Sequence, residues 1–240
     1  MNEPSPSTEP LRGPPSPPRG EGLGSIDTWL FDLDDTLYPE DSGIMDLIRE
    51  RITGFVMRIT GLDAEEARVV QRGWFEAHGA SLPGLLKEHD VSVEAFLVDI
   101  HDVPLDGIVP DPRLRAALAR LPGRRFVFTN GSSGHAERVL ERLGIADLFG
   151  GVFHIESGGL IPKPDPRTFD VMATRFGIDP ARTAFFEDTA RNLKPAADMG
   201  MTTVLIGPHA LASQAPFVHH RAEHLTPFLE SLTFAEPTLP

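Results

Sequence analysis

TWLFDLDDT (residues 28–36) joins a short apolar run to three carboxylates, Asp32, Asp34 and Asp35. The apolar run is typical of a buried β-strand. In an extended chain Asp32 and Asp34 point to the same side, where like charges are unfavourable unless a cation holds them. A solvated turn, which Asp-Asp-Thr also suits, is the alternative interpretation that this stretch alone leaves open.

Four more strand-like runs follow, and helical segments separate them. We expect strands at Thr28–Asp32, Arg125–Thr129, Val152–Ile155, Thr183–Glu187 and Thr202–Ile206. We expect helices from Asp111-Pro112 onward, over about His135–Leu143 with a stop at Gly144, from Asp165-Pro166 to near Gly177, and over about Asn192–Met199. Asp followed by Pro is a typical helix start and Gly a typical stop. The alternation predicts an α/β fold, a parallel sheet with helices on both faces.

Between the first strand and Asp111 lie roughly 70 residues with only helical signals, too many for a structureless loop in a compact domain. Asp63 and Glu66 resemble a capping box that starts one helix, and Ser92 precedes another. Seven apolar residues step by three and four along one helical face. They are Ile44, Leu47, Ile48, Ile52, Phe55, Val56 and Ile59. We therefore predict an all-α cap, residues 38–107, that is inserted after strand one and lies over the site at its end.

The rest of the chain divides into a core and two tails. We assign residues 25–37 and 108–230 to the α/β core and residues 231–240 to a C-terminal tail. Residues 1–24 hold seven Pro and four Gly with few aliphatic side chains. Such a segment buries too little apolar area to offset the entropy of ordering. We predict that it is a disordered, Pro-rich tail.

The composition excludes several classes of partner. The chain has 22 Lys and Arg against 35 Asp and Glu, a net charge of −13, which repels phosphate backbones and anionic lipid. Because cysteine is absent, disulfides, a thiol nucleophile and thiolate metal sites are excluded. No apolar run reaches membrane-spanning length, and the first 25 residues lack the apolar stretch of a secretory signal. We expect a cytoplasmic protein that binds neither nucleic acid nor membrane.

Other strand ends also carry polar residues. The second strand ends in Thr129–Gly131 (TNG), whose hydroxyl and amides can hold an anion at a helix start. Lys163 lies between two prolines just before a helix, and the fourth strand ends in Glu187 and Asp188. Open α/β sheets bind ligands beyond the carboxyl ends of their strands. If strand four lies beside strand one, the acidic ends meet, and such charges coexist only around a hard cation such as Mg²⁺.

These four runs, DLDDTLY, TNG, KP and ED in that order, resemble the four motifs of the haloacid dehalogenase (HAD) superfamily. The resemblance covers nearly the whole chain after Ser25, including a helical cap after the first motif. It implies a Rossmann-like HAD core and a phosphatase that works through an aspartyl phosphate. It also implies that Asp32 is the nucleophile and that Asp34 is the general acid and base.

The resemblance assigns phosphate binding to the second and third motifs. Thr129 would hydrogen-bond a phosphoryl oxygen, assisted by the amides of Asn130 and Gly131. Lys163 would neutralise charge on the phosphoryl group and on the nucleophile, which gives it a catalytic role. The expected substrate is a small phosphorylated metabolite.

The resemblance also assigns a Mg²⁺ site. Asp188 would bind the ion together with Asp32 and the main-chain carbonyl of Asp34, and Glu187 would act from the outer shell. Asn192 matches a variable position of the fourth motif. The cofactor that the resemblance implies is therefore Mg²⁺ alone.

Longer runs are similar to bacterial pyrimidine 5′-nucleotidases, among them DLDDTLYP, HGASLPGLL, HDVPLD, FTNGSSGHAERVL and NLKPAADMGMTTVLIG. This resemblance implies nucleoside 5′-monophosphates such as UMP and CMP as substrates. Asp34 argues against the dehalogenase branch, whose members have no acid two residues after the nucleophile. A sugar phosphomutase or a sugar-phosphate phosphatase shares the same core and is the alternative. A non-catalytic binding protein is less favoured because every motif acid is present.

Several residues outside the motifs admit two interpretations. His101 and Asp102, near the end of the cap, either touch the substrate or form a solvated helix terminus. Trp74 and Phe75 can line the pocket, but we expect them in the helical core. His135, in the first turn of its helix, is either structural or a substrate contact. Three further histidines are expected in a solvated terminal segment: His219, His220 and His224.

Overall fold

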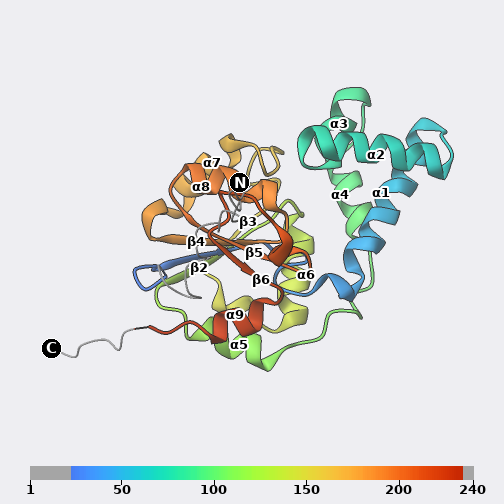
Figure 1. The fold of residues 1–240 in the computed structure, drawn as a ribbon. Helices are drawn as coiled ribbons and strands as arrows, with labels where there is room; N and C mark the ends of the chain where they lie inside the picture. The colour runs from blue at the N-terminus through green and yellow to red at the C-terminus, as the bar shows by residue number, and fades with distance from the viewer. Residues whose placement is uncertain (1–22, 235–240) are drawn as a thin grey trace, which may run out of the picture.

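The computed structural model describes residues 23–234 and is built around a six-stranded parallel sheet (Figure 1). The strand order is β3-β2-β1-β4-β5-β6, so β1 lies between β2 and β4. The strands are β1 Thr28–Phe31, β2 Arg124–Phe128, β3 Val152–Phe153, β4 Thr183–Glu187, β5 Thr202–Ile206 and β6 His220–Ala222. The predicted parallel sheet is confirmed, and so is the position of the fourth strand beside the first.

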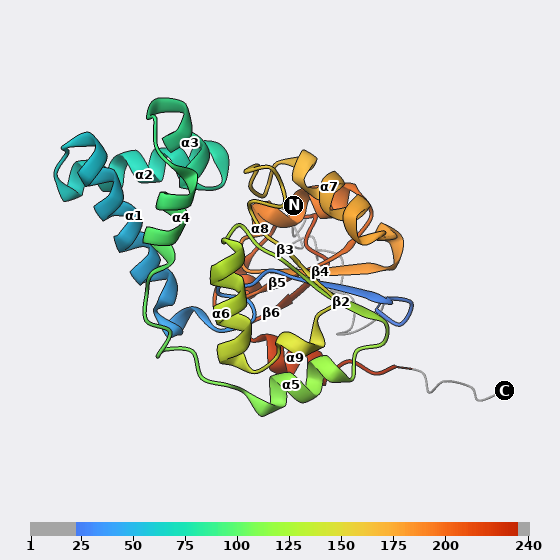
Figure 2. The ribbon, with the colours of Figure 1, turned by 180° about the vertical axis from the view of Figure 1, so that it is seen from behind.

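Helices cover both faces of this sheet (Figures 1 and 2). Helices α5, α6 and α9 pack on one face, and α7 and α8 pack on the other. Their bounds are α5 Pro112–Ala119, α6 Ser133–Leu143, α7 Pro166–Phe176, α8 Ala190–Asp198 and α9 Leu225–Glu230, with short 3-10 turns at Glu40–Ser42, Ala146–Leu148, Pro180–Arg182 and Ala210–Ala212. The predicted starts at Asp111 and Asp165 and the predicted stops at Gly144 and Gly177 are confirmed. None of the helices within residues 23–234 is long and apolar enough to cross a membrane.

Successive side chains of the short strand β1 point to opposite faces of the sheet and contribute to a hydrophobic core on each face. Trp29 and Phe31 join the cluster on the α5, α6 and α9 face, and Leu30 joins the cluster on the other face. All three side chains are fully buried, and each contributes about 1.5–3 kcal/mol through the apolar area that it removes from water. Phe31 also stacks on Phe186 of β4 with 4.7 Å between ring centroids.

The edge strand β6 lies where the sequence indicates a solvated segment, so that expectation is wrong for one of the three histidines, His220. His220 is buried and pairs in register with Val204 of β5. The ring of His219 accepts a hydrogen bond from the backbone N–H of Thr203 at 3.0 Å, but His219 is exposed, as is His224. The segment lacks the apolar pattern of a strand and pairs because β5 would otherwise present a free edge.

Helices α1–α4 form a lobe beside the sheet, with a hydrophobic cluster of its own (Figure 2). Their bounds are α1 Ile44–Thr60, α2 Ala64–His78, α3 Ser81–Glu88 and α4 Val93–His101. Phe55 of α1 meets Phe96 of α4 edge to face at 5.0 Å. The predicted capping box of Asp63 and Glu66 starts α2, and Ser92 caps α4. We call these four helices the cap.

The two segments that connect the cap with the sheet touch each other. A Cβ atom placed on Gly107 would lie 2.1 Å from the carbonyl oxygen of Ser42, so only glycine permits this approach. On the core side, Arg138 of α6 donates hydrogen bonds to the carbonyls of His101 and Val103, each at 2.8 Å. The entrance and the exit of the cap are therefore fixed next to the core.

The packed core extends beyond residues 25–230. Leu23 and Leu232 are each only 2% exposed, and Phe234 meets Trp29 edge to face at 5.8 Å. The predicted tails are therefore too long by these residues. The rest of the two tails, residues 1–22 and 235–240, lies outside the described residues.

The cap also contacts the core at Gly79, where α2 ends. Its φ is +86°, and an added Cβ would lie 2.2 Å from the carbonyl oxygen of Lys163 and 2.6 Å from Cδ of Pro164. Gly61, which ends α1, has a similar φ of +73° but no atom within 4 Å of an added Cβ. The two glycines therefore share a left-handed backbone conformation, but only Gly79 lies against the backbone of Lys163.

We expect Gly79→Ala to lower the free energy of unfolding more than Gly61→Ala does. Both variants force alanine into the left-handed region, at a cost of about 1–2 kcal/mol. Only Gly79→Ala adds the overlap with the Lys163 backbone, which costs about 1–3 kcal/mol more. Urea unfolding of the two variants measures the difference, and equal losses would contradict the close contact.

Candidate active site

The chain turns sharply just after β1. Asp32 continues the strand, because its N–H donates to the carbonyl of Phe186 on β4 at 2.9 Å. Three residues on, Asp35 has a φ of 56°, a left-handed conformation that few residues other than glycine adopt. Asp32 and Asp35 are 6% and 8% exposed. The alternative of a fully solvated turn is therefore wrong.

Lys163 lies at the centre of the site with 1% of its surface exposed. Its Nζ donates to Asp32 Oδ1 at 2.7 Å, to Glu187 Oε2 at 2.7 Å and to the carbonyl of Phe128 at 2.8 Å. Burial alone would lower the pKa of Lys163, but the two carboxylates raise it above its ordinary value. The lysine is therefore a permanent cation that joins the ends of β1 and β4.

One cation does not balance the carboxylates gathered here. Oxygens of Asp32, Glu187 and Asp188 lie within 4.8 Å of one another. Burial, and then the neighbouring acids, raise the pKa of Asp32 to about 8 and the pKa of Asp188 to about 7. Burial raises the pKa of Glu187 to about 7 against the opposing effect of Lys163. Three oxygen donors with excess negative charge fit a hard divalent cation such as Mg²⁺.

The partners of each acid distinguish the candidate ligands of such an ion. Glu187 Oε2 accepts from Lys163, and Oε1 accepts from Asn192 Nδ2 at 2.8 Å. Among the described residues, the Asp188 side chain accepts only a long hydrogen bond from the hydroxyl of Thr189, at 3.3 Å. Glu187 is thus already occupied by donors, and Asp188 is the freer candidate ligand.

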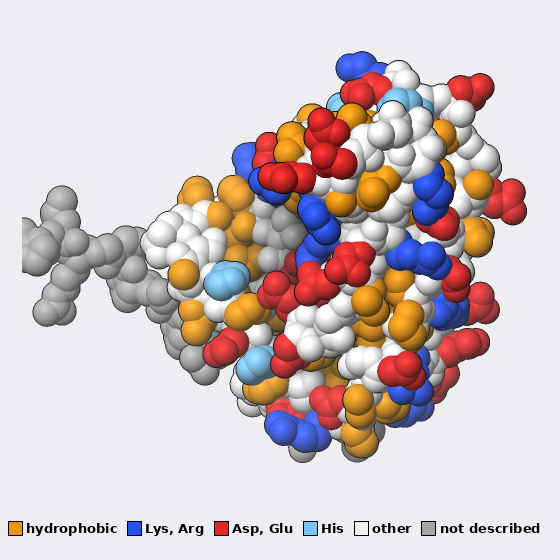
Figure 3. Space-filling view, turned by 90° about the vertical axis from the view of Figure 1, so that its right-hand side faces the viewer, with side chains coloured by type: hydrophobic (Ala, Val, Ile, Leu, Met, Phe, Trp, Pro, Cys, Tyr) orange, Lys and Arg blue, Asp and Glu red, His pale blue; other side chains and the backbone are white. Residues whose placement is uncertain are grey.

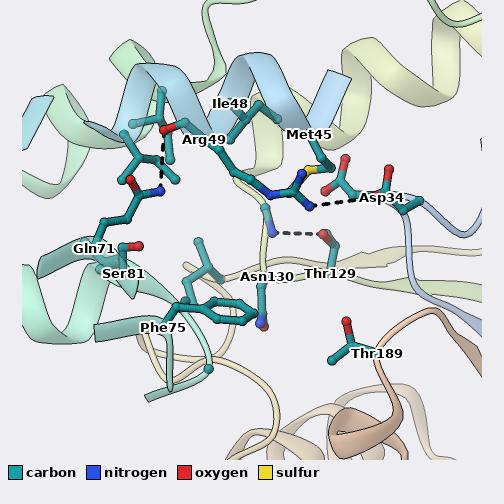
Figure 4. Close-up of a pocket in the computed structure, with 18 of the residues that line it drawn as sticks. Asp34, Met45, Ile48, Arg49, Gln71, Phe75, Ser81, Thr129, Asn130 and Thr189 are labelled. Carbon is teal, nitrogen blue, oxygen red and sulfur yellow. Dashed lines mark hydrogen bonds and ion pairs between the residues drawn. The ribbon is translucent and has the colours of Figure 1, made fainter. Parts of the chain in front are cut away.

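The TNG run after β2 holds the lysine loop as well as a candidate phosphate position. Figure 4 shows Thr129 and Asn130 of this run among the residues that line the cavity. Asn130 Oδ1 accepts from the N–H of Lys163 at 2.8 Å, and Asn130 Nδ2 donates to its carbonyl at 3.1 Å. The hydroxyl of Thr129 accepts from the N–H of Gly131 at 2.8 Å, next to the start of α6. Sequence reasoning assigns the amide of Asn130 to phosphate and misses its side chain, which positions Lys163.

Asp34 has two donors of its own, neither of which is Lys163. Its Oδ1 accepts from the hydroxyl of Tyr38 at 2.6 Å and from His135 Nε2 at 2.7 Å. Burial would raise the pKa of Asp34, but the His135 ring and the two hydrogen bonds lower it to about 2. Both donors lie in runs that resemble the pyrimidine nucleotidases, and this resemblance is the signal that singles them out in the sequence.

His101, at the C-terminal end of the cap helix α4, is buried, so the solvated interpretation is wrong for this residue. Its ring stacks on His135 of α6 with 4.5 Å between centroids and 18° between planes. Its Nδ1 lies 2.9 Å from the carbonyl of Leu97 and 3.0 Å from the hydroxyl of Ser132. Burial, with a further contribution from His135, lowers the pKa of His101 to about 4.

A cavity of about 670 Å³ lies between the cap and the ends of the strands. The space-filling view shows acidic and basic side chains gathered where the two lobes meet (Figure 3). The core contributes all the motif residues to its wall: Asp32, Asp34, Thr129, Asn130, Gly131, Lys163, Glu187 and Asp188. The cap contributes a mixed wall of apolar and polar side chains, among them Ile48, Ile52, Leu97, Arg49, Arg68, Arg72, Gln71 and Ser81.

The two aromatic residues near the end of α2 have different environments. Trp74 is buried in the cap, as expected, and its indole N–H donates to Glu88 at 3.0 Å. Phe75 is 47% exposed and lines the cavity, so the expectation of core packing is wrong for it. The guanidinium of Arg191, from the core helix α8, lies 4.2 Å from the Phe75 ring centroid. One helical position separates the two residues, which is enough to move Phe75 to the cavity face.

With this geometry, the chain belongs to the haloacid dehalogenase-like hydrolase family, which it matches over residues 26–200. The resemblance of its four motifs to that superfamily is therefore confirmed. The Rossmann-like HAD core that the resemblance implies is confirmed as well by the sheet order and the flanking helices.

The chain is also similar to several named proteins. Phosphate metabolism protein 8 of Saccharomyces cerevisiae is 31% identical over 193 residues, 74% of this chain and 60% of the yeast protein, so the chain spans less than two thirds of that relative. Glyceraldehyde 3-phosphate phosphatase of Methanocaldococcus jannaschii is 27% identical over 190 residues, 74% of this chain and 83% of the archaeal protein. L-2-haloacid dehalogenase of Xanthobacter autotrophicus has the same fold, with a TM-score of 0.52 and 17% identity over 85% of this chain and 97% of that chain.

We expect Lys163→Met to be strongly destabilising, because it leaves Asp32 and Glu187 buried without their shared cation. Breaking a buried ion pair costs about 3–5 kcal/mol. Adding Glu187→Gln removes one of the stranded charges and should recover part of the loss. Lys194→Met is the matched control: it breaks the exposed pair with Asp198 and should cost at most about 1 kcal/mol. Urea unfolding at pH 8 without Mg²⁺ measures all three, and equal losses for the two lysine variants would contradict this account.

We also expect the metal-free protein to lose stability as the pH rises from 6.5 to 8.5. Unfolded carboxyls ionise near pH 4, whereas Asp32, Glu187 and Asp188 hold protons to about pH 7 or 8 in the fold. The folded state therefore binds more protons in this window, and stability must fall as they leave. His101 acts in the opposite direction only below about pH 6.5, because its pKa is lowered to about 4.

Mg²⁺ should reverse this loss. At pH 8, free Mg²⁺ at about 100 times its Kd adds about 2.7 kcal/mol to the free energy of unfolding. Asp188→Asn should abolish most of the gain, while Asp198→Asn, on the exposed surface of α8, should leave it unchanged. Thermal unfolding with Mg²⁺ and with EDTA provides the measurement, and a gain that persists in Asp188→Asn would place the ion elsewhere.

Proposed function

We propose that the protein is a Mg²⁺-dependent phosphatase that hydrolyses phosphate monoesters of small metabolites. The observation that carries this proposal is the position of Asp32 at the base of the cavity, bonded to Lys163 and close to Asp188. A carboxylate can attack an anionic phosphate only when the negative charge is masked. The names of the yeast and archaeal relatives support phosphate chemistry.

In the first step, an oxygen of Asp32 attacks phosphorus and the bond from phosphorus to the leaving oxygen breaks. Asp34 gives a proton to that oxygen. Asp34 is ionised in the free protein, and an arriving phosphate dianion raises its affinity for the proton through like-charge repulsion. The hydroxyl of Thr129, whose oxygen accepts from the N–H of Gly131, would donate to a phosphoryl oxygen with help from the amide of Asn130, and Lys163 would keep the nucleophile neutralised.

In the second step, water attacks the phosphorus of the aspartyl phosphate, and the bond to Asp32 breaks. Asp34 takes a proton from the water, inorganic phosphate leaves, and Asp34 then releases this proton to solvent, which balances the one that it took up when the substrate bound and returns both aspartates to their starting states. A Mg²⁺ held by Asp32, Asp188 and the main-chain carbonyl of Asp34 would neutralise the phosphoryl oxygens when bound. Glu187 would orient Lys163 and Asn192 behind it.

The proposed substrates are pyrimidine nucleoside 5′-monophosphates, UMP and CMP. The exposed ring of Phe75 offers a flat apolar surface in the cavity on which a base can stack. Gln71 and Ser81 are polar groups on the same cap wall. A sugar-phosphate phosphatase is the second candidate, supported by the name of the archaeal relative, which acts on glyceraldehyde 3-phosphate.

We expect Asp32→Asn to abolish phosphate release by at least about 1,000-fold, because an amide is a poor nucleophile and cannot form the acyl phosphate. The amide still accepts a hydrogen bond from Lys163, so the fold should be retained. Phosphate release from UMP with Mg²⁺ measures the effect, and the circular dichroism of the variant controls for folding. Turnover near the wild-type rate would eliminate Asp32 as the nucleophile.

A substrate screen separates the two candidates. With UMP, CMP, ribose 5-phosphate and glyceraldehyde 3-phosphate, a nucleotidase should show the highest kcat/KM for UMP and CMP. We expect Phe75→Ala to raise KM for UMP about 10-fold, with little change for ribose 5-phosphate, because stacking contributes about 1–3 kcal/mol per base. Equal effects on both substrates would favour the sugar-phosphate alternative.

A further inference from the structure

The two oxygens of Asp34 have different surroundings. Oδ1 is fixed by the Tyr38 hydroxyl at 2.6 Å and by His135 Nε2 at 2.7 Å. Oδ2 lies on the side of the TNG run, because a Cβ placed on Gly131 would come 3.5 Å from it. A carboxyl group whose Oδ1 accepts two hydrogen bonds carries its proton on Oδ2. The two donors therefore decide which oxygen faces the cavity.

The hydrogen of His135 is also fixed by its surroundings. The side chain is fully buried, and its Nδ1 has no hydrogen-bond partner within residues 23–234. Nε2 is the nitrogen that faces the Asp34 carboxylate, at 2.7 Å. Because a carboxylate can only accept, Nε2 must carry a hydrogen and donate it to Asp34.

The cap holds the other face of this ring. His101 stacks on His135 at 4.5 Å, and its Nδ1 must carry a hydrogen because the carbonyl of Leu97 can only accept. The nearby hydroxyl of Ser132 lies at 3.0 Å and ties the ring to the start of α6. An unbroken series of contacts therefore runs from the cap, through two rings, to Asp34.

We propose that His135 is a positioning residue: its hydrogen bond to Oδ1 of Asp34 orients Oδ2 toward the leaving oxygen. Because His101 of the cap stacks on His135, this orientation depends on the cap lying against the core. The inference rests on the proposed function, since it assigns Asp34 the acid role. The proton passes from Asp34 Oδ2 to the leaving oxygen as the phosphorus–oxygen bond breaks. His135 keeps its Nε2 hydrogen throughout and transfers none.

The test compares two phosphate monoesters that differ in their need for an acid. The alkoxide leaving group of UMP needs a proton, whereas p-nitrophenyl phosphate releases a stable phenolate. kcat/KM reports the step in which the leaving group departs and excludes the later hydrolysis of the aspartyl phosphate. If the carboxyl group of Asp34 is wrongly oriented, kcat/KM should therefore fall for UMP and change little for p-nitrophenyl phosphate.

We expect His135→Ala to lower kcat/KM about 100-fold for UMP and less than about fivefold for p-nitrophenyl phosphate. His135→Gln, which returns an N–H donor near the position of Nε2, should recover most of the loss. Tyr38→Phe removes the other donor and should show the same substrate split. His220→Ala, which removes a buried histidine at the far edge of the sheet, is the matched control and should affect neither substrate.

The cap contribution is tested at His101. His101→Ala removes the ring and should lower kcat/KM for UMP about 10-fold, again with little effect on p-nitrophenyl phosphate. His101→Phe keeps a flat ring for stacking and should lose less. If both His101 variants behave like the wild type, the link to the cap is wrong.

Other outcomes overturn the inference in distinguishable ways. Equal losses on both substrates in His135→Ala and Tyr38→Phe would mean that these residues only support the fold. Should His135→Ala fail to fold, His135→Gln and Tyr38→Phe decide the question by the same ratio of kcat/KM values. Wild-type protein that hydrolyses neither substrate would overturn the proposed function itself, and this inference with it.

Discussion

The site depends on the ion pairs of Lys163 with Asp32 and Glu187. These contacts join the ends of β1 and β4 to the loop after β3, so a single amine fixes segments far apart in the sequence. Both ion pairs are buried. Removing one partner would leave the other charge unpaired away from water, which is costly. Asn130 holds the main chain of Lys163 in turn. The charges of the site therefore also organise the C-terminal edge of the sheet.

Much of this arrangement could be predicted because residue type and strand order carry it. Apolar runs mark the strands, Asp-Pro and Gly mark the helix ends, and parallel strands bring their carboxyl ends to one edge. Asp32, Lys163 and Asp188 each follow or precede such an element in the sequence. Their meeting therefore needs only the adjacency of β1 and β4 and no knowledge of side-chain packing.

The features that the sequence conceals are those decided by tertiary contacts. Periodicity shows that Phe75 lies on a helix, but whether that face meets the cap interior or the cavity depends on how α2 is rotated. His101 reads as a helix terminus and is buried because α6 packs against it. The strand at His220 has no apolar pattern and forms at an edge that β5 supplies. In each case the partner, distant in the sequence, determines the environment.

The contact between Gly107 and Ser42 has a consequence for the history of the fold. Where a chain leaves a domain and returns at nearly the same point, the excursion can be lengthened, shortened or exchanged without separating the strands on either side. The four-helix excursion here is such a module, since its hydrophobic cluster is largely its own. Diversification of such enzymes can therefore proceed by substitution of a whole lobe, while the carboxylates and the amine beneath it stay in place.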